Sequence, residues 1–355
     1  MLLALLRSAI HQQEVEATYF QRATEHDWLE CYLLALHQGV LSLSWDGVHR
    51  LPSNCPPPLN VKLSWALREM EQREKYREQC LTLTTLTQLL AQYGISTMVL
   101  KGVGLSRLYP IPSHRESGDI DIYTYSADKL RMSDAEANRL ADEIILQQGA
   151  IMDDLPSKKH SRFGVYGATI ENHRMFLHLA ECQATIKAEQ WLQQHISTNT
   201  VDLLDGECHI EVPSAAFDSV FIPLHAAQHY GMGISLKHLC DWAILIKQNG
   251  LTVPSDLDDK YFKQVVNALT LLCNQHLGLS IPVEADHRLA NDMMQEILHP
   301  PYYGLVPSGG RCKQYLFQLR NRIHIFRLRH RLLGVSFWGK VRGLCRRKIR
   351  EYVSL

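Results

Sequence analysis

The sequence lacks the patterns that mark several common classes of protein. No stretch reaches the roughly 18 consecutive apolar residues that a membrane-spanning helix needs. Walker A loops, G-x-S-x-G elbows and Rossmann glycine fingerprints are missing, which excludes P-loop, hydrolase and dinucleotide-binding functions of those types. Internal repeats and low-complexity tracts are missing too. The 355 residues, 46% hydrophobic and 21% charged, have the composition of a globular protein long enough for two domains.

Cysteines are present but do not pair in the sequence. The nine cysteines are scattered, odd in number and free of C-x-x-C spacing. This pattern favours reduced thiols over a disulfide framework or a cysteine zinc site, and it predicts a cytoplasmic protein. The apolar opening MLLALLRSAI carries no basic residue before its leucines and no small-residue cleavage site. We therefore expect a helix there rather than a signal peptide.

Acidic residues are absent from one long segment. The formal net charge is zero, yet residues 311–350 hold 13 Lys and Arg and no Asp or Glu, which leaves 24 basic and 36 acidic residues in 1–310. Apolar and aromatic residues recur among the arginines in a helical rhythm. We expect this segment to dock on the acidic remainder of the chain through its apolar stripe. Peripheral membrane contact is the second interpretation, and nucleic-acid binding is the least favoured.

Both flanks of the chain have helical periodicity. In residues 1–50, leucines and aromatics recur at spacings of three and four. A proline cluster at 55–60 breaks this pattern, and a long, charge-rich helix follows that ends near Gly94, a residue suited to a helix C-terminus. From Ala215 to about Asn249 the pattern is helical again, and most of the remainder is helical.

The middle of the chain mixes strands with helices. Residues 95–100, ISTMVL, are short, β-branched and apolar, which is typical of a buried strand. Further along we expect a short helix at VGLSRLY, a strand at GDIDIYTY, a helix at 133–149, a hairpin that turns near Gly167 and a strand at 208–212. The middle of the chain is thus predicted to be α/β in its order of elements, between two helical flanks.

Two carboxylates stand out within one of these strands. The segment GDIDIYTY alternates strictly, which places Asp119 and Asp121 on the same face. Carboxylates this close repel each other, and a shared proton, a cationic neighbour or a divalent ion relieves the repulsion. His114 and Arg115 just upstream could supply the positive charge. Hard oxygen donors also suit Mg²⁺ or Mn²⁺, so the pair is either a metal site or a solvated strand edge.

The order of these parts resembles a known family. A strand, a glycine at its end, a short helix, a loop and a strand with D-x-D follow one another in the nucleotidyltransferase core of the polymerase-beta superfamily. The stretch is most similar to the bacterial family of uncharacterised nucleotidyltransferases. That family's motifs appear here as Leu100-Lys101-Gly102, Leu108-Tyr109-Pro110, Arg115 and Gly118-Asp119-Ile120-Asp121. The resemblance covers residues 95–125 closely and about 90–245 more loosely.

The resemblance implies a fold and an activity. The fold would be α+β, with a nucleotidyltransferase palm of mixed β-sheet and helices in residues 91–212. A helical segment, 1–90, would precede the palm, and a C-terminal helical domain with the basic tail, 213–355, would follow it. The activity would be transfer of a nucleoside monophosphate from an NTP such as ATP to a hydroxyl or phosphate acceptor, with release of pyrophosphate. The alternative is an inactive nucleotide-binding or antitoxin-like regulator, and no motif identifies the acceptor.

The resemblance also assigns roles to the carboxylates. Asp119 and Asp121 would hold two Mg²⁺ or Mn²⁺ ions, and a third carboxylate from a later strand would complete the group. Glu171, in ATIENHRMF, matches the family's strand in which Glu stands two positions before His, and Glu211, in HIEVP, is the alternative. Glu171 would bind the ion that activates the nucleophile and accept its proton. His173 would orient Glu171, contact phosphate or simply be packed in the core.

Four residues are candidates for binding the nucleotide. Lys101 and Gly102 would seat the triphosphate, because a residue without Cβ lets the main chain approach phosphate and the amides of the following helix favour an anion. Gly102 could also mark no more than a tight turn. Related enzymes carry Gly-Ser at this point, and here Ser106 or the Lys101 ammonium would replace that serine. Arg115 is the fourth candidate.

A histidine pair lies on the predicted helix that follows the palm. His225 and His229 have the i, i+4 spacing that binds zinc when a third ligand is at hand, but no Glu adjoins His225, so the metalloprotease signature is absent. Similar families carry paired histidines and then an Asp in a leucine-rich helix, which is Asp241 here. A hydrogen-bonded network between helices is the favoured role, and lining of the nucleotide or acceptor pocket is the alternative. Lys237 could reach phosphate.

Overall fold

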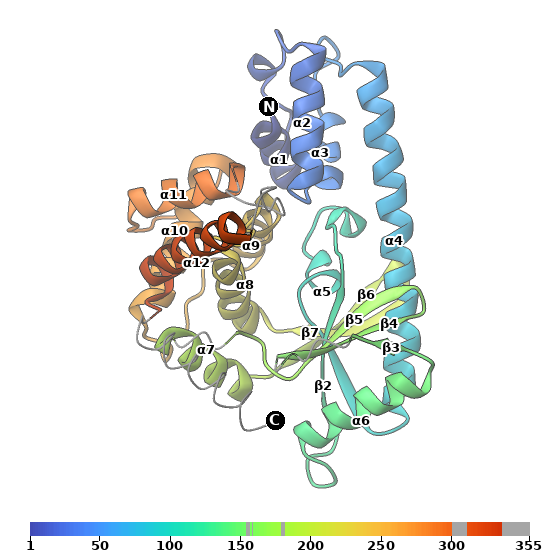
Figure 1. Cartoon of the computed structure of the whole chain (residues 1–355). Helices are drawn as coiled ribbons and strands as arrows, with labels where there is room; N and C mark the ends of the chain where they lie inside the picture. The colour runs from blue at the N-terminus through green and yellow to red at the C-terminus, as the bar shows by residue number, and fades with distance from the viewer. Residues whose placement is uncertain (154–156, 158, 179–181, 300–310, 336–355) are drawn as a thin grey trace.

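The N-terminal part of the protein is built from helices, as the periodicity predicts (Figure 1). A computed structural model of the chain describes residues 1–153, 157, 159–178, 182–299 and 311–335. The N-terminal helices are α1 (Leu2–His11), α2 (Glu25–His37), α3 (Leu41–Val48) and the long α4 (Leu59–Ala91), with a 3-10 turn, η1, at Ala17–Tyr19. Thr24 and Asp27 cap the start of α2 reciprocally. The helix α4 begins directly after the proline cluster, where proline at the N-terminus is tolerated.

A seven-stranded mixed sheet follows, so the predicted α+β fold is confirmed. The strands are β1 (Ile95–Val99), β2 (Ile120–Ser126), β3 (Ile151–Met152), β4 (His160–Val165), β5 (Ala168–His173), β6 (Thr198–Leu203) and β7 (Cys208–Pro213). Their order across the sheet is β3-β4-β5-β2-β1-β7-β6. β1 runs antiparallel to β2 and parallel to β7, while β5 runs parallel to β2. The start of β2 and the end of β1 therefore lie side by side.

The two faces of the sheet differ in what they contact. Ile120 and Ile122 are fully buried in a core that they share with α4 and with α6 (Asp134–Gln147). On the opposite face, Tyr123 packs against Phe176 at 4.7 Å between ring centroids, and Phe176 packs against Phe217 of α8 (Ala215–His229). The alternation of β2 thus directs Asp121, which shares the face of Tyr123, toward the C-terminal helices.

Short elements connect β1 to β2. α5 (Val103–Ser106) and the 3-10 turn η2 (Pro112–His114) lie between the two strands, and a further turn, η3 (Leu204–Gly206), joins β6 to β7. The buried ring of His114 bonds the carboxylate of Asp46 at 2.8 Å and that of Glu69 at 2.9 Å. This contact fixes the connection against α3 and α4.

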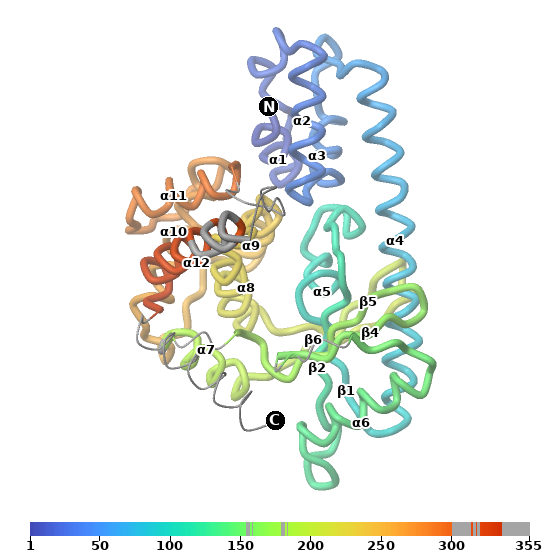
Figure 2. Tube along the Cα trace, in the orientation of Figure 1, coloured from blue at the N-terminus to red at the C-terminus, as the bar shows by residue number. Residues whose placement is uncertain are grey.

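The C-terminal helices pack against both other parts of the chain. Besides α8 they are α7 (Gln183–Gln194), α9 (Leu236–Asn249), α10 (Lys260–Leu277), α11 (His287–Leu298) and α12 (Arg311–Leu333). Gln38, at the end of α2, ties them to the N-terminal helices. Its side-chain carbonyl accepts from the Leu236 amide at 2.8 Å, and its amide donates to the Ile297 carbonyl at 2.7 Å. In Figure 2 the lower end of the blue N-terminal helices lies near α9.

The basic segment docks on the rest of the protein over its described part. α12 packs on α8 and α10, and Leu332, Leu333 and Val335 are buried. Arg331 forms ion pairs with Asp286 and Asp292. Membrane contact stays a prediction, and residues 336–350 of this segment lie outside the described residues. Within the described part of the chain, no helix is both long and apolar enough to cross a bilayer.

Candidate active site

The turn after β1 brings a cation and a glycine to the start of β2. Gly102 has φ +57°, and a Cβ built on it would lie 2.7 Å from the Ser117 hydroxyl, so only glycine fits this turn. The following helix, α5, is only four residues long. Its dipole is therefore small, and the positive charge at this turn comes from the Lys101 ammonium.

Asp121 is buried between two positively polarised groups. Its carboxylate is 3% exposed, and it lies 2.8 Å from the Lys101 ammonium and 2.8 Å from Nε2 of His173. Burial opposes its ionisation, but Lys101 and His173 outweigh this effect and hold the pKa of Asp121 well below its usual range. Asp121 is therefore a carboxylate anion at any physiological pH. His173 is fully buried, which corresponds to the packed role rather than to an open contact with phosphate.

Glu171 lies beside Asp121 because β5 runs parallel to β2. The two residues are paired in register across the strands. Burial raises the pKa of Glu171, but the imidazole of His173, whose Nε2 lies 3.6 Å from the carboxylate, outweighs burial, and the net shift is downward. Single ligand atoms of His160, Glu171 and His173 all lie within 4.8 Å of one another. This end of the sheet therefore concentrates donors that could hold a cation.

Asp119 stands at the mouth of the same site and is the least shielded of the three carboxylates. Its side chain is 35% exposed and lies 3.5 Å from the Arg162 guanidinium. Burial, followed by the negative charges of Glu171 and Asp121, raises the pKa of Asp119. Mutual repulsion among carboxylates is what a divalent cation relieves, and hard oxygens suit Mg²⁺ or Mn²⁺. The donor set of this site therefore fits such an ion.

Glu211, the alternative third carboxylate, is not part of this group. It lies on β7, and its pairing partner on β1 is Met98 rather than a residue next to Asp121. Its carboxylate accepts a hydrogen bond from the Tyr125 hydroxyl at 2.6 Å. Parallel pairing of β5 with β2 thus brings Glu171, and not Glu211, to the aspartates.

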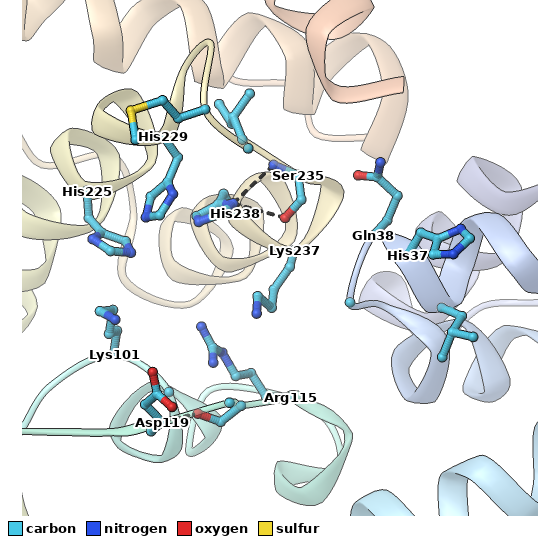
Figure 3. Close-up of a pocket in the computed structure, with 18 of the residues that line it drawn as sticks. His37, Gln38, Lys101, Arg115, Asp119, His225, His229, Ser235, Lys237 and His238 are labelled. Atoms are coloured by element: carbon cyan, nitrogen blue, oxygen red, sulfur yellow. Dashed lines mark hydrogen bonds between the residues drawn. The ribbon is translucent and has the colours of Figure 1, made fainter. Parts of the chain in front are cut away.

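A cavity of about 860 Å³ opens in front of the aspartates. Its walls come from the end of α2, from the β1–β2 region and from α8 and α9 (Figure 3). The polar residues that line it are His37, Gln38, Lys101, Arg115, Ser117, Asp119, Asp121, His225, His229, Ser235, Lys237 and His238. A second cavity of about 600 Å³ shares Lys101 and Asp119 with the first and adds Lys159 and Glu171. Cavities of this size accommodate small-molecule ligands.

The candidate residue Arg115 reaches the first cavity, and Ser106 does not. The Arg115 guanidinium binds both carboxylate oxygens of Asp241, at 3.1 Å and 2.7 Å, and Tyr109 donates to the same carboxylate at 2.7 Å. Arg115 thereby links the β1–β2 connection to α9. Ser106 is fully buried, where its hydroxyl donates to the Val103 carbonyl. It therefore does not contact the cleft.

Two further lysines turn an unpaired charge toward the cavities. Among the described residues, the ammonium groups of Lys159 and Lys237 have no carboxylate partner in a salt bridge and no hydrogen bond. Burial, and then repulsion from Lys101 for Lys159 or from Arg115 for Lys237, lowers the pKa of each to about 8. Both are mainly ammonium ions at pH 7. Unpaired buried ammonium groups of this kind are suited to bind an anion.

The histidine pair also lines the first cavity, but not in a network with Asp241. Asp241 is taken up by Arg115 and Tyr109, whereas His225 and His229 gather with His238 of α9. The structure therefore separates the predicted helix network into an Arg–Asp–Tyr contact and a histidine cluster.

The sequence alone does not show that several residues belong to this site. His160 and Arg162 alternate on β4, which puts them on one face, but only strand pairing shows that this face meets Glu171. Lys159 precedes the same strand. His238 lies nine positions after His229 and across a turn, so helical spacing cannot join them. These contacts depend on tertiary packing.

The region that contains the site matches a family of known proteins. A family model described as uncharacterised nucleotidyltransferase matches residues 24–284, a span that includes the whole sheet and α8 to α10. Among solved structures, an antigenic nucleotidyltransferase-like protein from Paracoccidioides brasiliensis matches with a TM-score of 0.37 and 13% sequence identity. That match covers 58% of this chain and 94% of the other. No curated protein matches the sequence significantly.

Proposed function

Since the chain belongs to the family of uncharacterised nucleotidyltransferases, we propose that it transfers a nucleoside monophosphate from an NTP to a hydroxyl or phosphate acceptor. The observation that carries this proposal is the register of the sheet, which sets Asp121 and Glu171 side by side with Asp119 at the mouth of the cleft. Bound Mg²⁺ or Mn²⁺ would neutralise phosphate charge and make the acceptor hydroxyl more acidic. A cytoplasmic location is part of the proposal and is supported by the seven cysteines whose side chains the structure describes, all of them free and buried.

The residues of the cleft have distinct parts in the proposed reaction. Asp119, Asp121 and Glu171 would hold the metal ions, because they are the oxygen donors at the sheet end. Lys101, Lys159 and Lys237 would bind the triphosphate oxygens, and Gly102 would let the main chain approach them. Asp241 holds Nε and Nη2 of Arg115, and the Glu116 carbonyl accepts from Nη1. The N–H groups left over would face the nucleotide.

The proposed transfer forms one bond to phosphorus and breaks another. An acceptor oxygen forms a bond to the α-phosphorus, and the bond from that phosphorus to the oxygen bridging the α- and β-phosphates breaks. The leaving group is pyrophosphate, and the acceptor's proton passes to Glu171. Asp121, whose pKa is held well below its usual range, would stay ionised as a metal ligand throughout.

We expect Asp119→Asn and Asp121→Asn each to reduce NTP-dependent pyrophosphate release by about a hundredfold or more, because each removes a negative donor from the metal site. The assay incubates the full chain with each labelled NTP, Mg²⁺ and a cell extract, and follows pyrophosphate and labelled product. Glu211→Gln is the matched control and should keep wild-type turnover. Full activity in both aspartate variants would exclude the assignment.

The second candidate function is nucleotide binding without turnover. It is favoured by one observation, since Lys101 and His173 already balance Asp121 within the protein. Calorimetric titration with a non-hydrolysable NTP distinguishes the two functions. Tight binding by a wild-type protein that releases no pyrophosphate with any NTP would establish the regulator in place of the transferase.

A further inference from the structure

Three histidines converge on the helical wall of the cleft. His225 and His229 stand one turn apart at the end of α8, and His238 lies in the first turn of α9 (Figure 3). Ring centroids are separated by 4.7 Å for His225 and His229, 4.8 Å for His229 and His238, and 5.7 Å for His225 and His238. One nitrogen from each ring can be chosen so that all lie within 4.8 Å of one another.

An ordinary structural role accounts for only one of the three rings, since His238 caps the start of α9. Within the described part of the chain, the rings of His225 and His229 make no hydrogen bond and no ion pair. The charged groups that affect the three rings most are cationic, namely Lys101, Lys159, Lys237, Arg115 and Arg329. Histidines without carboxylate partners are not the salt-bridging kind. Their ring nitrogens are therefore available to a ligand in the cavity.

The chemistry of the cluster matches a transition metal. Burial, followed by the nearby cations, lowers the pKa of His229 to about 4 and holds the pKa of His225 and His238 well below the usual range. The rings are therefore neutral at pH 7, which is the form that coordinates metals. Imidazole nitrogen prefers Zn²⁺ and related ions, in contrast to the hard oxygens of the aspartates.

Ser235 holds the ring of His238. Nδ1 of His238 lies 3.0 Å from the Ser235 hydroxyl and accepts a hydrogen bond from the Ser235 amide at 3.1 Å, so the proton of the neutral ring is on Nε2. Coordination of a metal through Nε2 would shift this proton to Nδ1, where the Ser235 hydroxyl can accept it, and an outer partner of this type fixes the ring of a metal-bound histidine. A tetrahedral zinc ion sets ligand nitrogens about 3.3 Å apart, so the rings need only close by small side-chain rotations.

We propose that His225, His229 and His238 bind a zinc-class transition-metal ion whose fourth coordination position opens into the cleft and takes an anionic oxygen. Three histidines with one open position are a recurrent zinc arrangement. The surrounding cations disfavour a bare divalent ion, and an anion at the open position offsets them. This site is separate from the carboxylates and does not depend on the proposed transfer reaction.

Metal titration of the full-length, metal-stripped protein tests this site. Addition of Co²⁺ should give the intense visible absorption of a tetrahedral ion, and Zn²⁺ should displace it at one ion per chain. Inorganic phosphate should change the Co²⁺ spectrum and tighten binding, because it occupies the open position. A weak, octahedral Co²⁺ spectrum would overturn the proposal, and an unchanged spectrum with phosphate would refute the open position.

Variants locate the ion. His225→Ala, His229→Ala and His238→Ala should each weaken Zn²⁺ affinity by about tenfold or more, with Ser235→Ala giving a smaller loss. His209→Ala changes an exposed histidine on β7 and should bind like the wild type. Circular dichroism checks that each variant is folded. Loss of Zn²⁺ binding in Asp119→Asn with retention in all three histidine variants would assign the ion to the carboxylates instead.

Discussion

At the scale of single residues, Lys237 shows how burial prepares a charge for a ligand. The side chain enters the cleft from α9, and no carboxylate among the described residues pairs with its ammonium. Arg115 and Lys101 repel it, while Asp241 and Glu116 attract it more weakly than burial disfavours it. The result is a lysine that titrates near physiological pH instead of at its usual value.

This titration makes nucleotide affinity depend on pH. The pKa of Lys237 is about 8 in the free protein, so the ammonium is present below pH 8 and lost above it. The affinity for a non-hydrolysable NTP should therefore fall between pH 7 and pH 9. The Kd should rise by about tenfold or more at full deprotonation, since a charge-assisted hydrogen bond contributes about 1.5–3 kcal/mol.

Replacing Lys237 with arginine tests whether deprotonation of this lysine causes the pH dependence. The Lys237→Arg variant keeps its positive charge throughout this pH range, so its affinity should depend less on pH. Adding Lys159→Arg should reduce the pH dependence further, because the pKa of Lys159 is also about 8. Lys62→Arg, on the exposed surface of α4, is the control. An unchanged pH profile in the double variant would show that other groups control binding.

At the scale of elements, α12 is a structural part of the helical core. The prediction of docking by charge and by an apolar stripe holds for its described residues, and the buried end of the stripe contributes most. Leu332 is 0% exposed, whereas the ion pairs of Arg331 lie near the surface, where such pairs contribute little.

Truncating the buried leucine should therefore destabilise the whole protein. We expect Leu332→Ala to lower the free energy of unfolding by about 2–5 kcal/mol, the usual range for deleting a buried leucine side chain. Urea denaturation followed by circular dichroism measures the change. Ile323→Ala, at a position 45% exposed on the same helix, should cost under about 1 kcal/mol. Equal losses in both variants would mean that α12 packs differently.

At the scale of the whole molecule, the cleft depends on contacts between distant parts of the chain. Gln38 closes its N-terminal wall through Leu236 and Ile297, and its own carbonyl accepts from the Lys237 amide at 3.3 Å. Residues of the sheet form the facing wall. The division of the chain at residues 90 and 212 stays a prediction, but the cleft is formed by residues from all three proposed parts.

Removing the Gln38 side chain should weaken both folding and binding. Gln38→Ala leaves the amide of Leu236 and the carbonyl of Ile297 without these partners, at a cost of about 1–3 kcal/mol for each buried group. It should also raise the Kd for a non-hydrolysable NTP, because Lys237 adjoins the lost contact. Urea denaturation and calorimetric titration measure the two effects. Gln13→Ala, on an exposed residue, should change neither, and wild-type behaviour of Gln38→Ala would show that the contact is dispensable.

The sequence predicted those features that follow from local spacing. The alternation of Ile120 and Asp121 gave the two faces of β2, and the spacing of His225 and His229 gave a shared helix face. Strand β6, TNTVDL, was not predicted because its residues are largely exposed and do not alternate. The interruption of the helix between α8 and α9, which places His238 beside His229, also carries no periodic signal. These features depend on tertiary contacts, which local sequence patterns do not specify.

The hydrogen bond from the Leu236 amide to Gln38 joins residues 198 positions apart. A ribosome delivers the N-terminal helices long before α9 exists, and the entropy of closing so large a loop is recovered only when both partners are present. The N-terminal wall of the cleft therefore lacks its hydrogen bonds to the C-terminal helices during most of translation. Nascent chains released before residue 236 would carry the aspartates and the sheet but could not assemble the pocket in front of them.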